Sequence, residues 1–297
     1  MTTRQQSETV DPADAEFLSE DQIAFYAREG YLLLPRFLSD REMAGVKHAF
    51  SDKVSEIADE LFMNGLVDDK FEAEPFQSRL ARLFDHLTDQ DFLKFGRSWR
   101  DRHPGYFDLM SNSRILDVIE SLVGGEIFAN PVYNARPKVP RVAAGAVPWH
   151  QDKSYWPGAN ANPVITVWIP LVDANLENGC LHIWPRTHNK EVLSYGHETY
   201  SGTSYTEIDA KHMREARIVS LPMESGGAIL FNDRCVHMST PNNSNTVRWS
   251  VDLRYQPTDQ DPMVGHGIGF LARSRKSPER VAKVEDWIEL RPEHDPG

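Results

Sequence analysis

"TVRWSVDLRYQPT" (residues 246–258) is rich in β-branched and aromatic residues and ends in a Pro-Thr pair. This composition is typical of a β-strand that runs into a turn. Five similar runs precede it, separated by Gly, Pro, Asn and Asp. They are "EIFANPVYNARPK" (126–138), "PVITVWIPLVDA" (163–174), "GCLHIWP" (179–185), "REARIVSLP" (214–222) and "GGAILFND" (226–233). Because many short strands with turns between them predict a sandwich or barrel, we expect a β-rich core over about residues 126–260.

The chain upstream of these strands has the features of helices. Ser19 stands three residues before Gln22, and Ser39 three residues before Glu42, which is the capping-box pattern of a helix start. Gly30 predicts the end of the first of these helices, and the apolar run "YLLLP" after it predicts a short strand. We therefore expect a mainly β protein with supporting N-terminal helices.

The organisation along the chain follows from these patterns. A further helix is expected over residues 113–123, where two glycines follow the apolar run. The polar first segment, residues 1–16, is expected to be disordered. Residues 17–297 contain no linker-like stretch, so we expect one domain. It would comprise a helical part over about residues 17–125, the β-rich core and a C-terminal extension.

Composition excludes several classes of function. The 297 residues carry a net charge of −12, whereas a nucleic-acid or anionic-membrane surface needs positive charge. No run approaches the roughly 18 apolar residues of a membrane span, and the N-terminus has no signal-peptide core. The two cysteines fit neither a disulfide framework nor a CxxC site. We expect a cytoplasmic protein with free thiols that binds neither nucleic acid nor membrane; the oligomeric state is not indicated.

A possible metal motif lies in "VPWHQDKSYWP" (147–157), where His150 stands two residues before Asp152. Because a chain with 11 histidines produces such a pair by chance, the pair alone favours a strand-end histidine bonded to the backbone. A distant third ligand changes this interpretation, and His237, after the strand-like "GGAILFND", supplies one. Two imidazoles and a carboxylate on one face of an octahedron leave three positions open, as in non-haem Fe(II) oxygenases.

Arg248 lies eleven residues after His237, within the β pattern "TVRWSVDL". A buried arginine needs an anionic partner, and its planar fork suits a carboxylate. The partner could be a bound carboxylate ligand, or an internal Asp or Glu in a structural ion pair.

Together these motifs resemble the phytanoyl-CoA dioxygenase (PhyH) family of Fe(II)- and 2-oxoglutarate-dependent oxygenases. The resemblance runs from "FYAREGYLLLPRFLSDREM" to "VRWSVDLRYQPTD", with "PWHQDKSYW", "NGCLHIWPRTH" and "VHMSTPNNSNTVRWSVDLRY" in the family's order. It implies a double-stranded β-helix, a jelly-roll of the cupin type. It also implies Fe(II), 2-oxoglutarate and O2 as cofactor and cosubstrates, with oxidative decarboxylation to succinate and CO2 coupled to hydroxylation of an unactivated C–H bond.

The same resemblance assigns roles at the centre of the site. His150, Asp152 and His237 would be the catalytic Fe(II) ligands. Arg248 would bind the distal carboxylate of 2-oxoglutarate, assisted by the hydroxyl of Ser239. Related halogenases have a small residue at the position of Asp152, so a carboxylate there favours hydroxylation, with desaturation or ring formation also open.

Three further residues match positions that often line the cosubstrate pocket, namely Trp168, Gln151 and Lys138. Core packing is the alternative for Trp168, and an outward orientation is equally open for Gln151, which alternates with two inward ligands. The chain departs from the family's "PGSH" segment, since Arg186 and Thr187 precede the histidine.

The substrate is not identified by these patterns. A free small molecule is expected, because no basic cluster suits the phosphates of coenzyme A. The segment 197–212 is expected to be a polar loop over the site. The candidate substrate residues, each of which could equally be a surface or core residue, are Trp149, Lys153, Tyr155, Trp156, Arg136 and Arg186.

Two hypotheses from other classes of function remain. A cupin-like protein could use the same triad for another metal without 2-oxoglutarate chemistry, and would not require Arg248 or Ser239. A non-catalytic β-sandwich binding module would not require the intact triad. The presence of every ligand that the resemblance demands favours the oxygenase.

Overall fold

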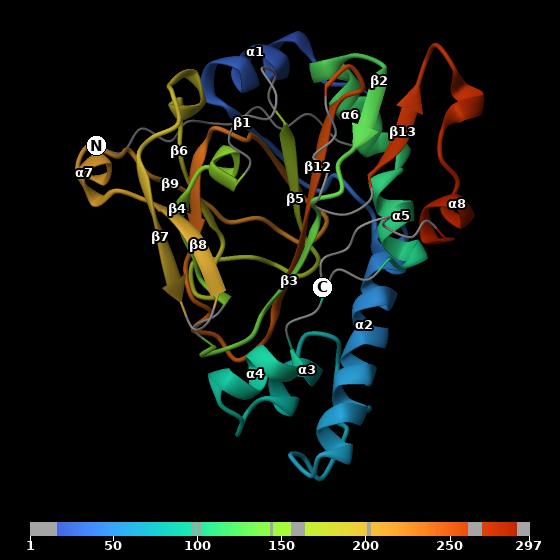
Figure 1. The fold of residues 1–297 in the computed structure, drawn as a ribbon, viewed down its shortest axis with the longest axis vertical. Coiled ribbons are helices and arrows are strands. Elements are labelled where there is room, and N and C mark those ends of the chain that lie inside the picture. Colours follow the sequence, from blue (N-terminus) through green and yellow to red (C-terminus); the bar gives the residue numbers. More distant parts are fainter. Residues whose placement is uncertain are drawn as a thin grey trace.

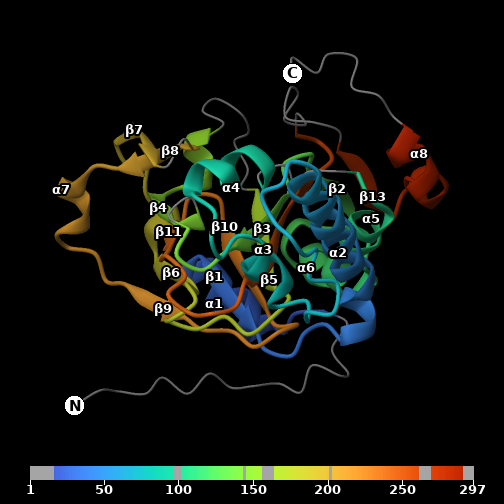
Figure 2. The same cartoon turned by 90° about the horizontal axis from the view of Figure 1, so that it is seen from below.

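Figure 1 shows the protein as a computed structural model, in which residues 17–96, 99, 102–142, 145–155, 164–200, 203–260 and 269–289 are described. The disorder predicted for residues 1–16 concerns a segment outside these ranges. Helices cover one side of a large β-sheet, and a smaller sheet lies on the other side. A two-stranded hairpin and a short helix lie beyond the smaller sheet, as the views in Figures 1 and 2 agree.

The described part of the N-terminal region forms six helices and one strand. They are α1 (Glu20–Glu29), β1 (Tyr31–Leu34), α2 (Asp40–Met63), α3 (Arg79–Leu83), α4 (Asp89–Phe95), α5 (Pro104–Met110) and α6 (Ser113–Val123). Both predicted capping boxes are present, at Ser19 with Gln22 and at Ser39 with Glu42. Gly30 ends α1 with a φ of 83°, a conformation that glycine adopts without steric cost. The helix predicted over residues 113–123 is α6. The predicted helix starts at Ser19 and Ser39, the helix end at Gly30 and this helix are therefore confirmed.

In the described ranges the strands form two antiparallel sheets and a separate two-stranded pair. Among the described residues the larger has seven strands in the order β1-β10-β5-β12-β2-β13, with β3 also paired to β12. Its further strands are β2 (Glu126–Ala129), β3 (Asn134–Lys138), β5 (Ile165–Pro170), β10 (Ala228–Asn232), β12 (Arg248–Pro257) and β13 (Phe270–Ser274). The smaller sheet comprises, in order, β4 (Val147–His150), β11 (Val236–Ser239), β6 (Leu181–Trp184) and β9 (Val219–Leu221). This architecture confirms the predicted jelly-roll with supporting helices.

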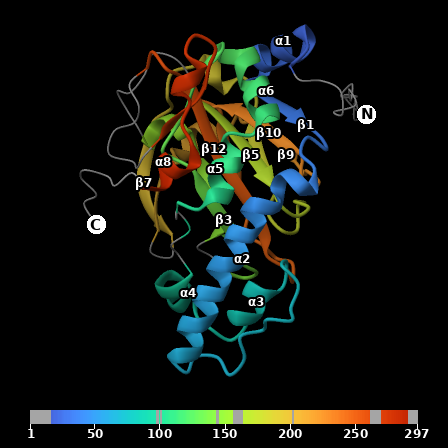
Figure 3. The same cartoon turned by 90° about the vertical axis from the view of Figure 1, so that its right-hand side faces the viewer.

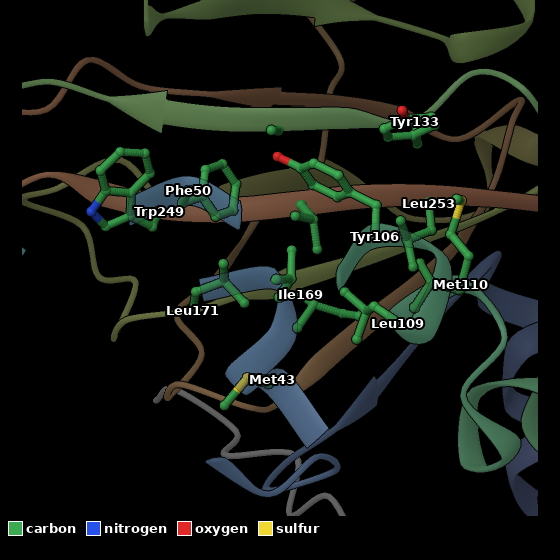
Figure 4. Close-up of a cluster of buried hydrophobic side chains, with 14 of the residues drawn as sticks. Met43, Phe50, Tyr106, Leu109, Met110, Tyr133, Ile169, Leu171, Trp249 and Leu253 are labelled. Carbon is green, nitrogen blue, oxygen red and sulfur yellow. The ribbon is translucent and has the colours of Figure 1, made fainter. Parts of the chain in front are cut away.

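The two faces of strand β12 differ in polarity and in what they pack against. Side chains alternate between the faces of a strand, so one face of β12 carries large apolar residues and the other carries polar ones. The apolar face packs against the helices on the side seen in Figure 3, and Figure 4 shows Trp249 beside Phe50 of α2. Their ring centroids are 5.0 Å apart, and the Trp249 indole donates a hydrogen bond to the Phe76 carbonyl. The polar face of β12 is therefore left to face the smaller sheet.

The helical layer depends on a close approach between α2 and α5. A methyl group added at Gly105 would overlap the backbone carbonyl of Gly45 on α2, so the two helices touch through their backbones. Such contact leaves no space for a side chain, because protein interiors are close-packed.

Replacing Gly105 with alanine tests this contact. Two effects on the stability of the protein oppose each other in this variant. Helix propensity alone would stabilise the protein by about 1 kcal/mol. Overpacking against the Gly45 carbonyl costs about 1–3 kcal/mol, so a net loss of stability is expected. Urea unfolding of the two proteins measures the difference, and a more stable variant would contradict the close approach.

The segment predicted to be a polar loop forms regular secondary structure instead. Residues 197–212 were expected to form a polar loop, but they lie in a hairpin of β7 (Tyr195–Tyr200) and β8 (Thr203–Ile208), followed by α7 (Ala210–Met213). Tyr205 and Ile208 are buried, because β8 packs against β4. After β13 come a 3₁₀ turn (Pro278–Arg280) and α8 (Val284–Glu289). In the described part of the chain, no helix combines the length and the apolar character needed to cross a bilayer.

Candidate metal and cosubstrate site

Two neighbouring strands of the smaller sheet bring the two histidines together. His150 ends β4 and His237 lies in β11, and the two residues are direct partners in the antiparallel register. Their ring centroids are 4.1 Å apart. His150 Nδ1 lies 2.8 Å from the Pro148 carbonyl oxygen and His237 Nδ1 lies 3.0 Å from that of Cys235. When each Nδ1 donates to its carbonyl, each Nε2 is left with its lone pair free for a metal.

Asp152 completes the cluster from the start of a 3₁₀ turn (Asp152–Tyr155) that directly follows β4. Its Oδ1 lies 3.5 Å from His150 Nε2 and 3.9 Å from His237 Nε2. Two ligand atoms that each lie about 2.1 Å from one ion can be at most ~4.2 Å apart, so both separations fit a shared ion. Among the described residues these three form the group that could hold a metal, and all three are buried. Their two nitrogens and one oxygen suit Fe(II).

The second oxygen of Asp152 is held in place by other residues. Thr166 Oγ1 donates to Oδ2 at 2.8 Å, and Arg254 donates from Nη2 at 2.9 Å and from Nε at 3.2 Å. Burial alone would raise the pKa of Asp152, but the charge of Arg254 and the two imidazoles outweigh it and hold that pKa well below its usual range. The carboxylate is thus ionised, with Oδ1 turned towards the histidines.

Sequence reasoning missed this support. Arg254 and Thr166 were not among the candidates, and neither was Asp252, which accepts a 2.7 Å hydrogen bond from Arg254 Nη1. A signal was present, because residues 248, 252 and 254 share a face of one strand and carry charges within an apolar pattern.

Arg254→Gln is expected to weaken Fe(II) binding by about 10–100-fold, the usual effect of removing a group that orients a metal ligand. The matched control is Arg273→Gln, which removes a partly buried arginine from ion pairs with Asp117 and Glu120 at the sheet edge. Anaerobic titration calorimetry with Fe(II) measures the effect, with circular dichroism to verify the fold. Equal loss of affinity in both variants would show that Arg254 acts through general stability alone.

Arg248 has a different environment from Arg254, although both lie on the polar face of β12. Its guanidinium is buried, hydrogen-bonds to Ser250 Oγ at 2.6 Å and lies 5.4 Å from the ring centroid of Trp168. No carboxylate among the described residues forms an ion pair with it, and its Nε has no hydrogen-bond partner. Burial lowers the pKa of Arg248 to about 9, and the charge of Arg136 acts in the same direction. Within the described part of the chain the alternative of a structural ion pair is therefore wrong for Arg248, although the nearby charge of Asp252 opposes the lowering of its pKa.

A cavity connects Arg248 with the three candidate metal ligands. Ser239 and Trp168, two of the residues predicted to contact the cosubstrate, line it too. Lys138 does not line it but lies directly behind, donating to Ser239 Oγ at 2.8 Å and to the Thr240 carbonyl. Burial, followed by the charge of Arg248, lowers the pKa of Lys138 well below its usual range. The cavity thus brings three candidate metal ligands and a buried arginine to one space.

Two of the predicted residues are committed to other contacts. Gln151 is outside the lining of this cavity, and its amide bonds to the backbone of Arg234 at 2.6 Å and Leu193 at 2.8 Å. Its side chain is buried rather than exposed and is held by these two backbone groups, so its predicted contact with the cosubstrate stays a prediction that the cavity lining does not support. Arg186 forms a bidentate ion pair with Glu29 of α1, at 2.7 and 2.9 Å. It does not line the cavity and is not placed to reach a substrate there.

The remaining substrate candidates differ in whether they line the cavity. Arg136 lines it. Tyr155 meets the His150 ring edge-on at 5.7 Å and accepts a hydrogen bond from the Thr206 amide. Trp149 is half-buried on β4, and Lys153 is buried with its amide bonded to the Asp233 carbonyl, but neither lines the cavity. Trp156 lies outside the described residues.

Comparison with known proteins gives a family match over most of the chain. A family model described as Phytanoyl-CoA dioxygenase (PhyH) matches residues 26–250. The Phytanoyl-CoA dioxygenase domain-containing protein 1 homolog of Dictyostelium discoideum is 24% identical over 263 residues, covering 80% of this chain and 91% of that protein.

Two solved structures share the fold. The non-heme alpha ketoglutarate-dependent carbocyclase SnoK from nogalamycin biosynthesis superposes with a TM-score of 0.54 at 20% identity, over 82% of this chain and 85% of SnoK. The epimerase SnoN in complex with Fe3+, alpha ketoglutarate and nogalamycin RO gives 0.52 at 19% identity, over 81% and 84%. Both likenesses support the jelly-roll assignment.

Proposed function

Because the chain belongs to the phytanoyl-CoA dioxygenase family, and is thus a non-haem iron oxygenase that uses 2-oxoglutarate and O2, we propose that it hydroxylates an unactivated C–H bond of a small molecule. The observation that carries the proposal is the shared cavity between the three candidate metal ligands and the unpaired Arg248. Neither a cupin-like protein without 2-oxoglutarate chemistry nor a non-catalytic module accounts for a buried arginine that lacks an anion.

The proposed roles follow from the contacts. His150, Asp152 and His237 hold Fe(II), which when bound couples decarboxylation of 2-oxoglutarate to activation of O2. Arg248 binds the distal carboxylate of 2-oxoglutarate, and Ser239 adds a hydroxyl donor that Lys138 orients from behind. The apolar rings of Trp168 and Phe231 limit water around these charges, since both line the cavity.

Asp152 bears on the outcome of the reaction. Because its carboxylate is held by Arg254 and Thr166, it would supply the third protein ligand to a bound metal. An exogenous ligand such as chloride therefore has no vacant protein position to take. This supports hydroxylation over halogenation as the outcome.

Trp168→Leu is expected to raise the apparent Kd for 2-oxoglutarate by ~5–30-fold. A desolvated cation–π contact contributes about 1–2 kcal/mol, and its loss would let the Arg248 guanidinium tilt away from the cosubstrate. Trp168→Phe keeps an aromatic face and should retain most of the affinity. Anaerobic titration with 2-oxoglutarate measures both variants, and an unchanged Kd in Trp168→Leu would contradict the proposed orientation.

The function itself is tested by turnover under labelled O2. The iron-loaded protein is incubated with 2-oxoglutarate and pools of small metabolites, and succinate and oxygenated products are followed by mass spectrometry. The proposal predicts one labelled oxygen in succinate and one in the product, with matching yields. A product that gains a halogen or loses two hydrogens without gaining oxygen would replace hydroxylation by another outcome of the same chemistry.

A further inference from the structure

Among the described residues that line the cavity, Arg136 is the arginine whose side chain reaches solvent to a substantial degree. It lies on β3, opposite Ser250 of β12, and lines the same cavity as the candidate metal ligands. Its side chain is 34% exposed, whereas Arg248 and Arg254 are almost fully buried. Arg136 therefore lies where the cavity opens.

The guanidinium of Arg136 donates only some of the hydrogen bonds that it can make. Its Nε donates to Asp252 Oδ1 at 2.9 Å. In the described part of the chain, Nη1 and Nη2 make no hydrogen bond, so one edge of the fork is available. That edge presents two parallel N–H donors, the geometry that binds a carboxylate or a similar oxyanion bidentately.

The charges around the cavity leave an excess that the cosubstrate does not neutralise. Arg136 and Arg254 are matched by the carboxylates of Asp152 and Asp252. Fe(II) with Arg136, Arg248 and Arg254 would carry five positive charges, and Asp152, Asp252 and the two carboxylates of 2-oxoglutarate carry four negative charges. One positive charge therefore remains even when Arg248 is bound to the cosubstrate. Because an unbalanced charge in a water-poor cavity is costly, a further anion is favoured there.

We propose that the substrate carries an oxyanion group, such as a carboxylate, which the free edge of Arg136 binds at the mouth of the cavity. This deepens the proposed function and rests on it, since it places the substrate against the same metal site. Asp252 orients Arg136 and also accepts from Arg254, which holds Asp152. Three consecutive hydrogen bonds of 2.9, 2.7 and 2.9 Å thus connect the anion-binding arginine to the third metal ligand.

The experiment uses two small probes that differ in charge and hardly in shape, trifluoroacetate and trifluoroacetamide. The protein is loaded with Fe(II) and saturating 2-oxoglutarate without O2, so that Arg248 is occupied. The relaxation of the 19F signal of each probe is then measured against probe concentration, because a group bound near paramagnetic iron relaxes faster. Trifluoroacetate is expected to give a saturable enhancement, and trifluoroacetamide a much smaller one.

Three variants make the result specific. Arg136→Gln should weaken trifluoroacetate binding by ~10–100-fold, the effect of one charge-assisted bidentate contact. Arg136→Lys keeps the charge and should retain saturable binding. Arg275→Gln is the matched control, because it removes an exposed arginine that pairs with Glu120 at the outer sheet edge, and should leave binding unchanged.

The outcomes separate this inference from the proposed function. The visible charge-transfer band of Fe(II) with 2-oxoglutarate, recorded in the same samples, reports whether the site is assembled in each variant. If the band forms but wild-type protein shows no saturable response, or responds equally to the amide, the inference fails alone. Undiminished binding in Arg136→Gln also overturns it. If the band never forms, the proposed function fails and the inference fails with it.

Discussion

Asp152→Ala is expected to abolish Fe(II) binding and, with it, succinate formation from 2-oxoglutarate. The substitution removes the only carboxylate of the candidate triad and leaves two imidazoles. It also removes one of the two carboxylates that pair with the Arg254 guanidinium, the one at 2.9 Å, so a positive charge faces the position of the metal. The loss should exceed the roughly 10–100-fold that follows removal of a group behind a ligand.

The experiment compares Fe(II) affinity, measured anaerobically, with succinate yield. Asp117→Ala serves as the control, because it breaks a carboxylate–arginine pair of 2.6 Å with Arg273 away from the cavity. The double variant Asp152→Ala/Arg254→Met also removes the cation that pairs with Asp252 beside the metal position, and it should still fail to bind Fe(II). Full turnover in Asp152→Ala would remove Asp152 from the triad.

Arg248→Met is expected to raise the apparent Kd for 2-oxoglutarate by at least ~30-fold while Fe(II) still binds. Loss of a buried, hydrogen-bonded charge pair costs about 2–5 kcal/mol, and here the pair forms only when the cosubstrate is present. The same variant should be no less stable than wild type without ligand, since the guanidinium it removes is buried with no carboxylate to balance it.

Arg254 provides the contrast that makes this prediction sharp. It lies on the same face of the same strand but bonds to both Asp152 and Asp252. Its replacement should therefore destabilise the unliganded protein. Thermal unfolding with and without 2-oxoglutarate distinguishes the Arg248 variant from the Arg254 variant, because a ligand stabilises only a protein that binds it. A large loss of stability in unliganded Arg248→Met would mean that Arg248 has a structural partner.

The sequence predicts the fold where local physics decides the structure. Ser19 and Ser39 begin helices because their hydroxyls accept from free backbone amides, and Gly30 ends one because it adopts a positive φ. These effects need no tertiary information. The hairpin β7–β8 was missed because its residues look polar, and the apolar contacts of Tyr205 and Ile208 arise only when β8 packs against β4.

The site was predictable where a residue's role shows in its spacing, and not where it depends on orientation. His150 and His237 come together because β4 and β11 pair in a register that no spacing reveals. Arg248 was singled out as a cation in an apolar strand. Arg254 carries the same signal six residues later, yet it has the structural ion pairs that were weighed for Arg248. Which of two such arginines is paired depends on strands distant in sequence.

The most direct test of the central claim is an anaerobic titration of the metal-free protein with Fe(II) and then 2-oxoglutarate, recorded in the visible range. We predict a weak metal-to-ligand charge-transfer band that saturates with 2-oxoglutarate in wild type and requires far more of it in Arg248→Met. Fe(II) binding without any band would contradict the claim, because the metal would be held while the cosubstrate was not bound to it.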